Sequence, residues 1–314
     1  MSKILVTGSS GQLGSVLVEG LRNKYGVENV IASDIRFVDG FNGNFELVDA
    51  TEIESVRKVV KANNISQIYH LAAVLSANGE RNPMATWDIN MKSLLNVLEV
   101  SRNTGVQKVF FPSSIAVFGD QAPLDRTGNK SYLNPATVYG ISKAAGENWC
   151  NYYYQKYGLD IRSLRYPGVI GYQSLPGGGT TDYAIDIFHS ALRSNSYSCF
   201  LKGDTRLPMI FMDDAIRATL EIMEAPKEDV RIRTSYNLGA VSFSPKEIAT
   251  EIKKHLPDFS MGYEPDFRQD IADNWPRSID DSQARMDWKW NHAYDLEKMV
   301  ATMISKLKEQ YARV

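Results

Sequence analysis

Cysteine and histidine are scarce in this chain, with 2 cysteines and 4 histidines among 314 residues. None of them stands at ligand spacing, which argues against a structural zinc site, and Cys150 and Cys199 are expected to be reduced thiols rather than a disulfide. Long apolar runs are also absent, since no stretch approaches the roughly 20 residues that a membrane helix needs. The net charge of −2 excludes the basic surface typical of proteins that bind nucleic acid or a membrane surface.

The N-terminal sequence MSKILVTGSSGQLG has only a short apolar run that breaks at glycines, so it predicts no signal peptide. Together with the two reduced thiols, this predicts a cytoplasmic protein. The length allows one large domain or two modest ones.

The first half of the chain alternates short apolar runs with longer helical patterns. Strands are predicted over residues 3–8, 29–34, 44–49, 65–73, 106–114 and 159–167. Helices are predicted over 12–26, from Thr51 as N-cap, over 82–105 and over 138–158. This alternation predicts an α/β fold, with a doubly wound parallel sheet covered by helices on both faces. Beyond residue 170 the pattern is less regular and predicts a smaller mixed α/β lobe packed on the sheet.

A glycine-rich turn separates the first predicted strand from the first helix. ILVTGSSGQLG, residues 4–14, places Gly8, Gly11 and Gly14 at the spacing G-x-x-G-x-x-G, with Gln12 and Leu13 completing the loop. In a Rossmann domain these glycines permit a tight turn, the approach of a pyrophosphate, and close packing of helix on strand. The helix N-terminus then offers free N–H groups to phosphate. The context predicts a dinucleotide site; a plain glycine-rich turn is the alternative.

Asp34 ends the second predicted strand, 20 residues after Gly14. An acidic residue there accepts hydrogen bonds from the adenosine ribose and repels a 2′-phosphate, which predicts NAD. Ile35 and Arg36 follow it, and Arg36 is the nearby residue that would favour NADP. Asp49, followed by Ala50, comes after the third strand and is either an acceptor for the adenine amine or a surface turn residue.

Tyr139 and Lys143 are four residues apart on a predicted helix and therefore share one face. A lysine ammonium beside a phenol is expected to lower the phenol's pKa toward the working pH. Such a tyrosine exchanges a proton with a substrate hydroxyl while a hydride moves. Ser114, at the end of the 106–114 strand, has a hydroxyl that can hold the reacting oxygen. The alternative is a chance tyrosine–lysine pair on a solvated helix.

In combination, these motifs resemble the extended short-chain dehydrogenase/reductase superfamily, which includes the nucleotide-sugar epimerases. The glycine loop, HLAA (70–73), PSSIAVFG (112–119), YGISK (139–143) and MDDA (212–215) occur in the expected order. The resemblance implies an NAD-binding Rossmann domain over residues 1–170 and a mainly substrate-binding lobe over 171–314, with some segments returning to the first domain. It implies catalytic roles for Ser114, Tyr139 and Lys143, and cofactor contacts for Leu71, Ala72, Ala73, Asn90, Tyr166 and again Tyr139 and Lys143.

The chain departs from the nucleotide-sugar enzymes at two segments. In RYPG (165–168), Gly168 stands where those enzymes carry an asparagine that contacts the sugar nucleotide. In RLPMIFMDD (206–214), Leu207, Pro208 and Met209 replace an Arg-Asp-aromatic run. A diphosphate needs fixed cationic partners, so a large sugar-nucleotide substrate is disfavoured.

The segments YPGVIGYQSLPGGGTTDYAIDIF (166–188) and LPMIFMDDAIRAT (207–219) closely resemble the short-chain type of L-threonine 3-dehydrogenase. That resemblance implies amino-acid binding by Gly178, Gly179, Thr180, Thr181 and Asp182. Backbone N–H groups and threonine hydroxyls suit a carboxylate, and an aspartate suits an ammonium. The alternative is a glycine-rich turn with Thr180 or Thr181 as a helix cap. Ser76 and Trp275 are further candidates for substrate contact.

The implied reaction is NAD-dependent oxidation of the β-hydroxyl of L-threonine to 2-amino-3-oxobutyrate, without a metal ion. The resemblance also implies a homodimer in which the helices over 83–104 and 139–157 form a four-helix bundle. Three alternatives stay open: a nucleotide-sugar epimerase or dehydratase, a reductase of another small β-hydroxy compound, and a non-catalytic dinucleotide sensor.

Overall fold

A computed structural model describes residues 3–37, 43–177 and 179–312 of the chain. Its core is a seven-stranded sheet in the order β10-β6-β5-β4-β1-β2-β3, in which each neighbouring pair is parallel. The strands of this sheet are β1 (Lys3–Thr7), β2 (Val30–Asp34), β3 (Phe45–Leu47), β4 (Ile65–His70), β5 (Lys108–Ser114), β6 (Asp160–Tyr166) and β10 (Tyr236–Asn237). The predicted doubly wound parallel sheet is therefore confirmed.

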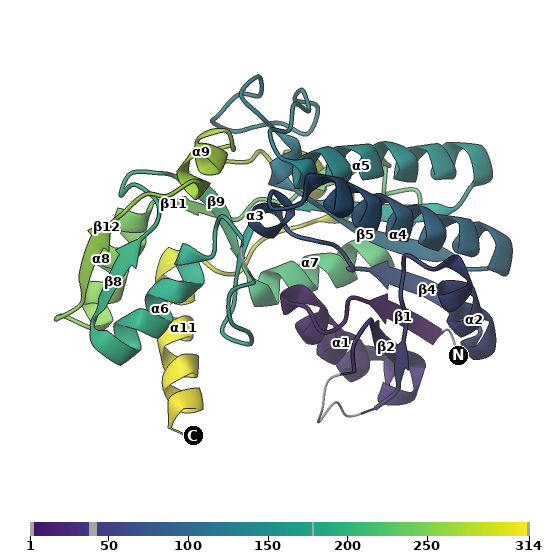
Figure 1. Cartoon of the computed structure of the whole chain (residues 1–314), viewed down its shortest axis with the longest axis horizontal. Coiled ribbons are helices and arrows are strands. Elements are labelled where there is room, and N and C mark those ends of the chain that lie inside the picture. The colour runs from purple at the N-terminus through teal and green to yellow at the C-terminus, as the bar shows by residue number, and fades with distance from the viewer. Residues whose placement is uncertain (1–2, 38–42, 178, 313–314) are drawn as a thin grey trace.

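Helices cover both faces of this sheet, because its strands are apolar on both sides. One face carries α2 (Ile53–Asn63), α4 (Pro83–Thr104) and α5 (Val138–Tyr157), and the other carries α1 (Gln12–Tyr25) and α7 (Met212–Glu224) (Figure 1). The strand order reverses between β1 and β4. In open α/β sheets, ligands bind outside the carboxyl ends of the strands at such a switch point.

Several helix ends agree with the sequence analysis. The helices α1, α4 and α5 end at the predicted glycines Gly26, Gly105 and Gly158. The predicted N-cap of α2 is wrong by one residue, since the N-cap is Glu52 rather than Thr51. The Thr51 hydroxyl is not available for capping because it donates a 2.6 Å hydrogen bond to the carboxylate of Asp49.

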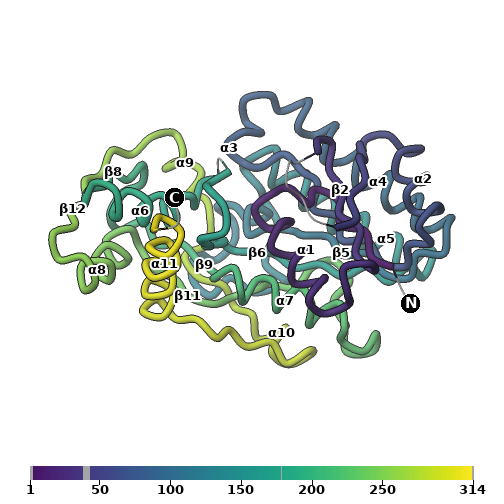
Figure 2. Tube along the Cα trace, turned by 90° about the horizontal axis from the view of Figure 1, so that it is seen from below, coloured from purple at the N-terminus to yellow at the C-terminus, as the bar shows by residue number. Residues whose placement is uncertain are grey.

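The remaining elements form a lobe beside the sheet. Its strands are β7 (Gly168–Ile170), β8 (Ser196–Cys199), β9 (Leu207–Phe211), β11 (Val241–Phe243) and β12 (Ser260–Tyr263), in the sheets β11-β9-β7 and β12-β8. Its helices are α6 (Tyr183–Ser194), α8 (Pro245–His255), α9 (Arg268–Asp273) and α11 (Leu296–Tyr311), and Figure 2 shows α11 lying in the lobe. Short elements complete the chain: η1 (Val27–Asn29), α3 (Ser76–Gly79), η2 (Ile115–Val117) and α10 (Ser282–Trp288).

The lobe is built from chain that leaves and re-enters the core. α7 lies beside α1 on the large sheet, and β10 extends that sheet at β6. The large sheet therefore includes segments from both halves of the chain. The carboxyl ends of its central strands face the lobe. Within the described residues, no helix combines the length and the apolar character required to cross a membrane.

Candidate active site

A cavity of about 250 Å³ lies where the carboxyl ends of the central strands meet the lobe. It is lined by the glycine loop, the segment after β4, the end of β5, one face of α5, the 166–169 segment, residues 179–182 and Trp275. The structure thus brings together residues from each of the three sets that the sequence analysis named for cofactor, catalysis and substrate.

The glycine loop requires glycine at two positions, where its backbone packs closely on the neighbouring chain. Gly8 has a φ of +71°, and a Cβ there would lie 2.6 Å from the backbone nitrogen of Ala72. A Cβ on Gly14 would lie 2.2 Å from the carbonyl oxygen of Gly8. No described side chain caps the N-terminus of α1, so its first N–H groups can receive a phosphate. The residues present therefore fit NAD.

Asp34 stands at the rim of the same loop. Its carboxylate accepts hydrogen bonds from the backbone N–H of Ser10 at 3.0 Å and of Ile35 at 2.8 Å. These bonds hold the carboxylate at the carboxyl end of β2, where the adenosine ribose lies in a Rossmann domain. Arg36 is exposed beyond it.

We expect Asp34→Ala to weaken NADH binding by roughly tenfold to 100-fold, because hydrogen bonds to a charged group contribute about 1.5–3 kcal/mol. The same change should raise the relative affinity for NADPH, since the carboxylate that repels a 2′-phosphate is gone. Fluorescence titration with both reduced cofactors measures this. Glu46→Ala, at an exposed residue of the adjacent β3, is the control. An unchanged ratio of the two affinities in Asp34→Ala would contradict the assignment.

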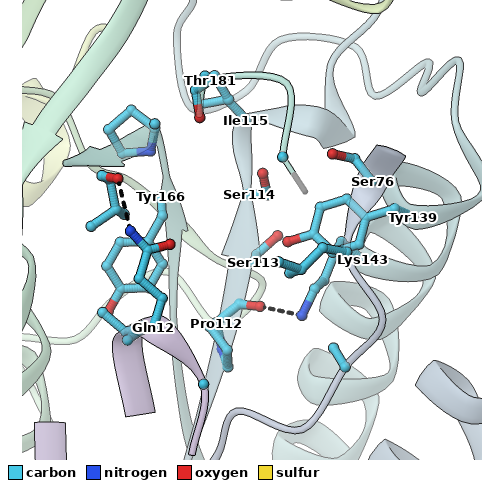
Figure 3. A pocket seen from close by; sticks show the side chains of 18 of the residues that line it. Gln12, Ser76, Pro112, Ser113, Ser114, Ile115, Tyr139, Lys143, Tyr166 and Thr181 are labelled. Carbon is cyan, nitrogen blue, oxygen red and sulfur yellow. Dashed lines mark hydrogen bonds between the residues drawn. The ribbon is translucent and has the colours of Figure 1, made fainter. Parts of the chain in front are cut away.

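The candidate catalytic side chains come from α5 and β5. Thr137 caps α5 by accepting a 3.1 Å hydrogen bond from the N–H of Gly140, which fixes the start of the helix beside the sheet. Tyr139 and Lys143 both extend from α5 toward the end of β5 that carries Ser114 (Figure 3). The Lys143 ammonium donates a 2.7 Å hydrogen bond to the carbonyl of Pro112 and lies 5.5 Å from the centre of the Tyr139 ring.

Burial dominates the ionisation of this pair. It raises the pKa of Tyr139 to about 12, against a hydrogen bond with Ser114 that lowers it. It lowers the pKa of Lys143 to about 8, while Cys150 and Glu147 act in the opposite direction. The expectation that Lys143 lowers the pKa of Tyr139 is therefore wrong for the protein without ligands. Here the ammonium is bonded to a backbone carbonyl, and desolvation outweighs the remaining effects.

The predicted carboxylate site at Gly179 is altered by a contact within the loop. The N–H of Gly179 donates a 2.7 Å hydrogen bond to the carboxylate of Asp182, so in this state that N–H is not available to a ligand. Gly178 lies outside the described residues. Thr180 is buried, and its hydroxyl has no hydrogen-bond partner among the described residues. A buried unpaired hydroxyl in a cavity wall is a candidate ligand contact.

Three further predicted residues line the cavity from different sides. Ser76 is the buried first residue of α3. Thr181 faces the cavity from the loop before α6. Trp275 follows α9, is 7% exposed, and forms the wall contributed by the second lobe. The cavity is therefore closed by residues from both parts of the chain.

Some predicted cofactor residues have other partners. The side-chain amide of Asn90 accepts from the N–H of Val74 at 2.8 Å and donates to the Val74 carbonyl and to Ser142. It therefore holds the segment after β4 and does not line the cavity. Asp49 is exposed and accepts from Thr51, which supports the turn interpretation. Ala50 is buried against α2 and α4.

Other predicted cofactor residues lie along the cavity, except Ala72, which packs against the core cluster under α2, α4 and α5. Leu71 and Ala73 line it, and Tyr166 does so while its hydroxyl bonds to Thr219 on α7. Gln12 donates a 3.4 Å hydrogen bond across to the carbonyl of Val169.

The cavity is also lined by Pro112, Leu75 and Val169, which the sequence analysis did not identify as site residues. Pro112 and Val169 each contribute a backbone carbonyl, which side-chain identity does not reveal. Leu75 could have been found from its position directly before Ser76. Among the described residues, no group of three or more histidine, cysteine, aspartate or glutamate side chains is arranged to hold a metal ion.

Gly168 closes the cavity on the side of the lobe. A Cβ there would lie 2.3 Å from the sulfur of Met209 and 2.8 Å from the side chain of Thr181. An asparagine at this position would therefore displace both neighbours. The absence of that asparagine, noted in the sequence, has a packing reason: Met209 and Thr181 occupy the space.

The family model of the NAD dependent epimerase/dehydratase family matches residues 4–239. A Bos taurus protein named L-threonine 3-dehydrogenase, mitochondrial, is 46% identical over 96% of this chain and 82% of its own length.

Two solved structures are similarly close. One is described as a GalE-like L-threonine dehydrogenase from Cupriavidus necator in its holo form; it is 51% identical, covers 97% of this chain and 99% of its own, and has a TM-score of 0.96. Another is described as a monomeric L-threonine 3-dehydrogenase from a metagenome database in its apo form; it is 48% identical, covers 98% and 99% of the two chains, and has a TM-score of 0.96.

Proposed function

Because this chain belongs to the NAD-dependent epimerase/dehydratase family, we propose that it is an NAD-dependent L-threonine 3-dehydrogenase. It oxidises the β-hydroxyl of L-threonine to 2-amino-3-oxobutyrate. The observation that carries this proposal is the composition of one small cavity, in which the dinucleotide loop and Ser114, Tyr139 and Lys143 meet the 179–182 segment. Relatives that cover nearly all of this chain bear the name of the same enzyme.

The catalytic roles follow from the positions of the side chains. The β-hydroxyl of the substrate lies between Ser114 and Tyr139, so that Ser114 orients it and Tyr139 removes its proton. Lys143 stabilises the phenolate that Tyr139 requires for this step, and Ser114 contributes a hydrogen bond in the same direction. NAD⁺, when bound, supplies the hydride acceptor and a formal positive charge.

The substrate's polar groups are held by the loop before α6. The carboxylate of Asp182 recognises the ammonium, and the hydroxyls of Thr180, Thr181 and Ser76 recognise the carboxylate. Gly179 N–H joins them only if Asp182 releases it on binding. Trp275 covers the substrate and excludes water from the cavity.

Cofactor binding is assigned to the glycine loop with Gln12 and Leu13, to Asp34, Ile35 and Arg36 at the ribose, and to the segment after β4. Residues 1–170 then bind mainly NAD, and residues 171–314 bind mainly substrate. The return of α7 and β10 to the large sheet supports a shared boundary rather than two independent units.

We expect Thr180→Val to raise the KM for L-threonine roughly fivefold, because one hydrogen bond contributes about 1 kcal/mol. The melting temperature should not fall, since the hydroxyl is buried and has no partner among the described residues. Steady-state kinetics and thermal unfolding measure the two effects. Thr250→Val, on the exposed face of α8, is the control. A lower melting temperature with an unchanged KM would assign Thr180 to packing.

The reaction itself is tested with L-threonine deuterated at Cβ. The proposal expects the deuterium in the NADH that is released, and 2-amino-3-oxobutyrate or its decarboxylation product, aminoacetone, as the second product. Mass spectrometry of both products measures this. Turnover of a UDP- or dTDP-sugar with no net NADH would support the epimerase alternative instead.

We also propose a homodimer and a cytoplasmic location. The helices α4 and α5 lie side by side and expose Met84, Ile89, Trp149 and Tyr152, which is apolar surface that a second copy can cover. One similar protein is described as monomeric. Analytical ultracentrifugation tests the dimer, and the expected mass is about twice 35.2 kDa.

The proposed cytoplasmic location is supported by the cysteines. Cys150 and Cys199 are both buried free thiols, as is usual in a reducing compartment.

A further inference from the structure

A buried carboxylate lies behind the candidate catalytic pair. Glu147 is on α5, one helical turn after Lys143, and its side chain is completely buried. It accepts a hydrogen bond from the Ser113 hydroxyl at 2.5 Å and two from the Arg165 guanidinium, at 2.8 and 2.6 Å. The proposed mechanism does not use this residue.

Arg165 extends the contact to β10, the edge strand of the large sheet. It lies on β6, is also buried, and donates to the carbonyl of Asn129 at 2.9 Å and to the side chain of Asn237 at 3.2 Å. The ion pair therefore joins α5 to β5, β6 and β10. A buried ion pair contributes little net stability compared with apolar side chains of the same shape, so a role in fixing geometry explains it better than a role in stability.

The residues that Glu147 contacts are next to the reacting groups. Ser113 precedes Ser114 on β5 and follows Pro112, whose carbonyl holds the Lys143 ammonium at 2.7 Å. Glu147 thus clamps the helix that carries Tyr139 and Lys143 to the strand that carries Ser114. A slip of α5 along β5 would change both the distance from Tyr139 to Ser114 and the hydrogen bond of Lys143.

The charge of Glu147 also acts on Lys143. Burial lowers the pKa of that ammonium to about 8, and the negative charge of Glu147, together with Cys150, opposes this. None of the other groups named below supplies a negative charge near Lys143 in place of Glu147. His70 on β4 is buried and neutral, since burial and the charge of Lys143 lower its pKa to about 3. Pro112 and Phe111 of β5 carry no charge, and Arg165 of β6 is positive.

We propose that Glu147 is a positioning residue for the dehydrogenase reaction: clamped by Ser113 and Arg165, it sets the place of Tyr139 and Lys143 against Ser114 and keeps the lysine charged. This inference rests on the proposed function for its kinetic part. It predicts an effect on kcat and on the pH profile rather than on substrate affinity.

Glu147→Gln keeps the shape and removes the charge. We expect kcat for L-threonine to fall roughly tenfold to 100-fold, since small displacements of catalytic groups have effects of this size, while KM stays within about twofold. The alkaline limb of the pH profile should move to lower pH by roughly one unit, because the loss of a nearby negative charge lowers the pKa of an ammonium.

A matched control lies at the far end of the same strand. Asp160 begins β6, is buried, and pairs with Arg162 at 2.9 Å and Arg233 at 2.6 Å. It is about 16 Å from Arg165 along the strand, given about 3.3 Å per residue. Asp160→Asn should destabilise the protein as Glu147→Gln does, with an unchanged kcat and pH profile. An equal shift in both variants would overturn the proposal, as would a wild-type profile in Glu147→Gln.

Two further measurements keep the inference testable. If Glu147→Gln does not fold, Ser113→Ala removes one contact and leaves the charge, and it should lower kcat by about threefold to tenfold without moving the alkaline limb. An unchanged kcat in Ser113→Ala would contradict the clamp.

The second measurement needs no substrate. The Cε resonance of Lys143 in protein labelled with carbon-13 lysine, assigned by its loss in Lys143→Met, should titrate at lower pH in Glu147→Gln than in the wild-type protein. If the two titrations differ but the wild-type protein does not oxidise L-threonine, the proposed function is refuted and the effect of the Glu147 charge on Lys143 stands. An identical titration in both proteins would refute the charge effect.

Discussion

Replacing Tyr139 with phenylalanine should lower kcat for L-threonine oxidation by roughly 100-fold to 10,000-fold, which is the usual contribution of a positioned acid–base group. The ring would remain in place, because it packs against the core cluster that includes Ile115 and Ala116. Only the hydroxyl that takes the substrate proton would be missing. NADH binding should therefore stay as in the wild-type protein.

Stopped-flow and steady-state assays measure kcat, and fluorescence titration measures NADH binding. Tyr183→Phe is a matched control: Tyr183 is buried at the start of α6, and its hydroxyl has no hydrogen-bond partner among the described residues. This control should keep its kcat. Retained turnover in Tyr139→Phe would remove Tyr139 from the proton-transfer step.

Replacing Lys143 with methionine should lower kcat by at least about 100-fold, because the phenolate of Tyr139 would lose its nearest stabilising cation. Methionine suits the site sterically, since the end of the lysine side chain already lies 4.7 Å from the centre of the Phe111 ring. The pH dependence should change as well. In the wild-type protein we expect activity to level off or fall as Lys143 loses its proton, because burial lowers the pKa of Lys143 to about 8. In Lys143→Met the residual activity should keep rising with pH as Tyr139 ionises.

Lys108→Met is the control for this substitution. Lys108 lies at the opposite end of β5 and, like Lys143, donates to a backbone carbonyl, that of Met223 at 2.9 Å. Burial lowers its pKa too. Losing this lysine should change stability but leave the kcat profile as it is. A Lys143→Met profile that still turns down on the alkaline side would mean that another group sets that limb.

The parts of the site that follow from local spacing could be predicted from the sequence. Gly8 and Gly14 are specified by a turn and a close approach between residues that are near in the chain, and Tyr139 and Lys143 share a helix face because they are four residues apart. Asp34 follows from the end of a predicted strand. These constraints are local, so a sequence reveals them.

The parts of the site that depend on tertiary neighbours could not be predicted from the sequence. Lys143 was expected to act on Tyr139, but its hydrogen bond goes to the carbonyl of Pro112 on another element. The pKa of Tyr139 rises because the fold buries it, and the tyrosine–lysine motif alone does not indicate how deeply the tyrosine is buried. Asn90, on the helix after the predicted cofactor segment, was expected to contact the cofactor, yet its amide is used by Val74 and Ser142. Residue type was informative in each case, whereas the partner was decided by packing.

The most direct test mixes the purified 314-residue chain with NAD⁺ and L-threonine at neutral to mildly alkaline pH and follows NADH absorbance. L-serine, L-allo-threonine and 3-hydroxybutyrate serve as parallel substrates, and NADP⁺ replaces NAD⁺ in a further reaction. Rapid NADH formation with L-threonine and NAD⁺, and little with the others, is the expected result. No NADH from L-threonine, in protein that binds NADH normally, would contradict the proposed function.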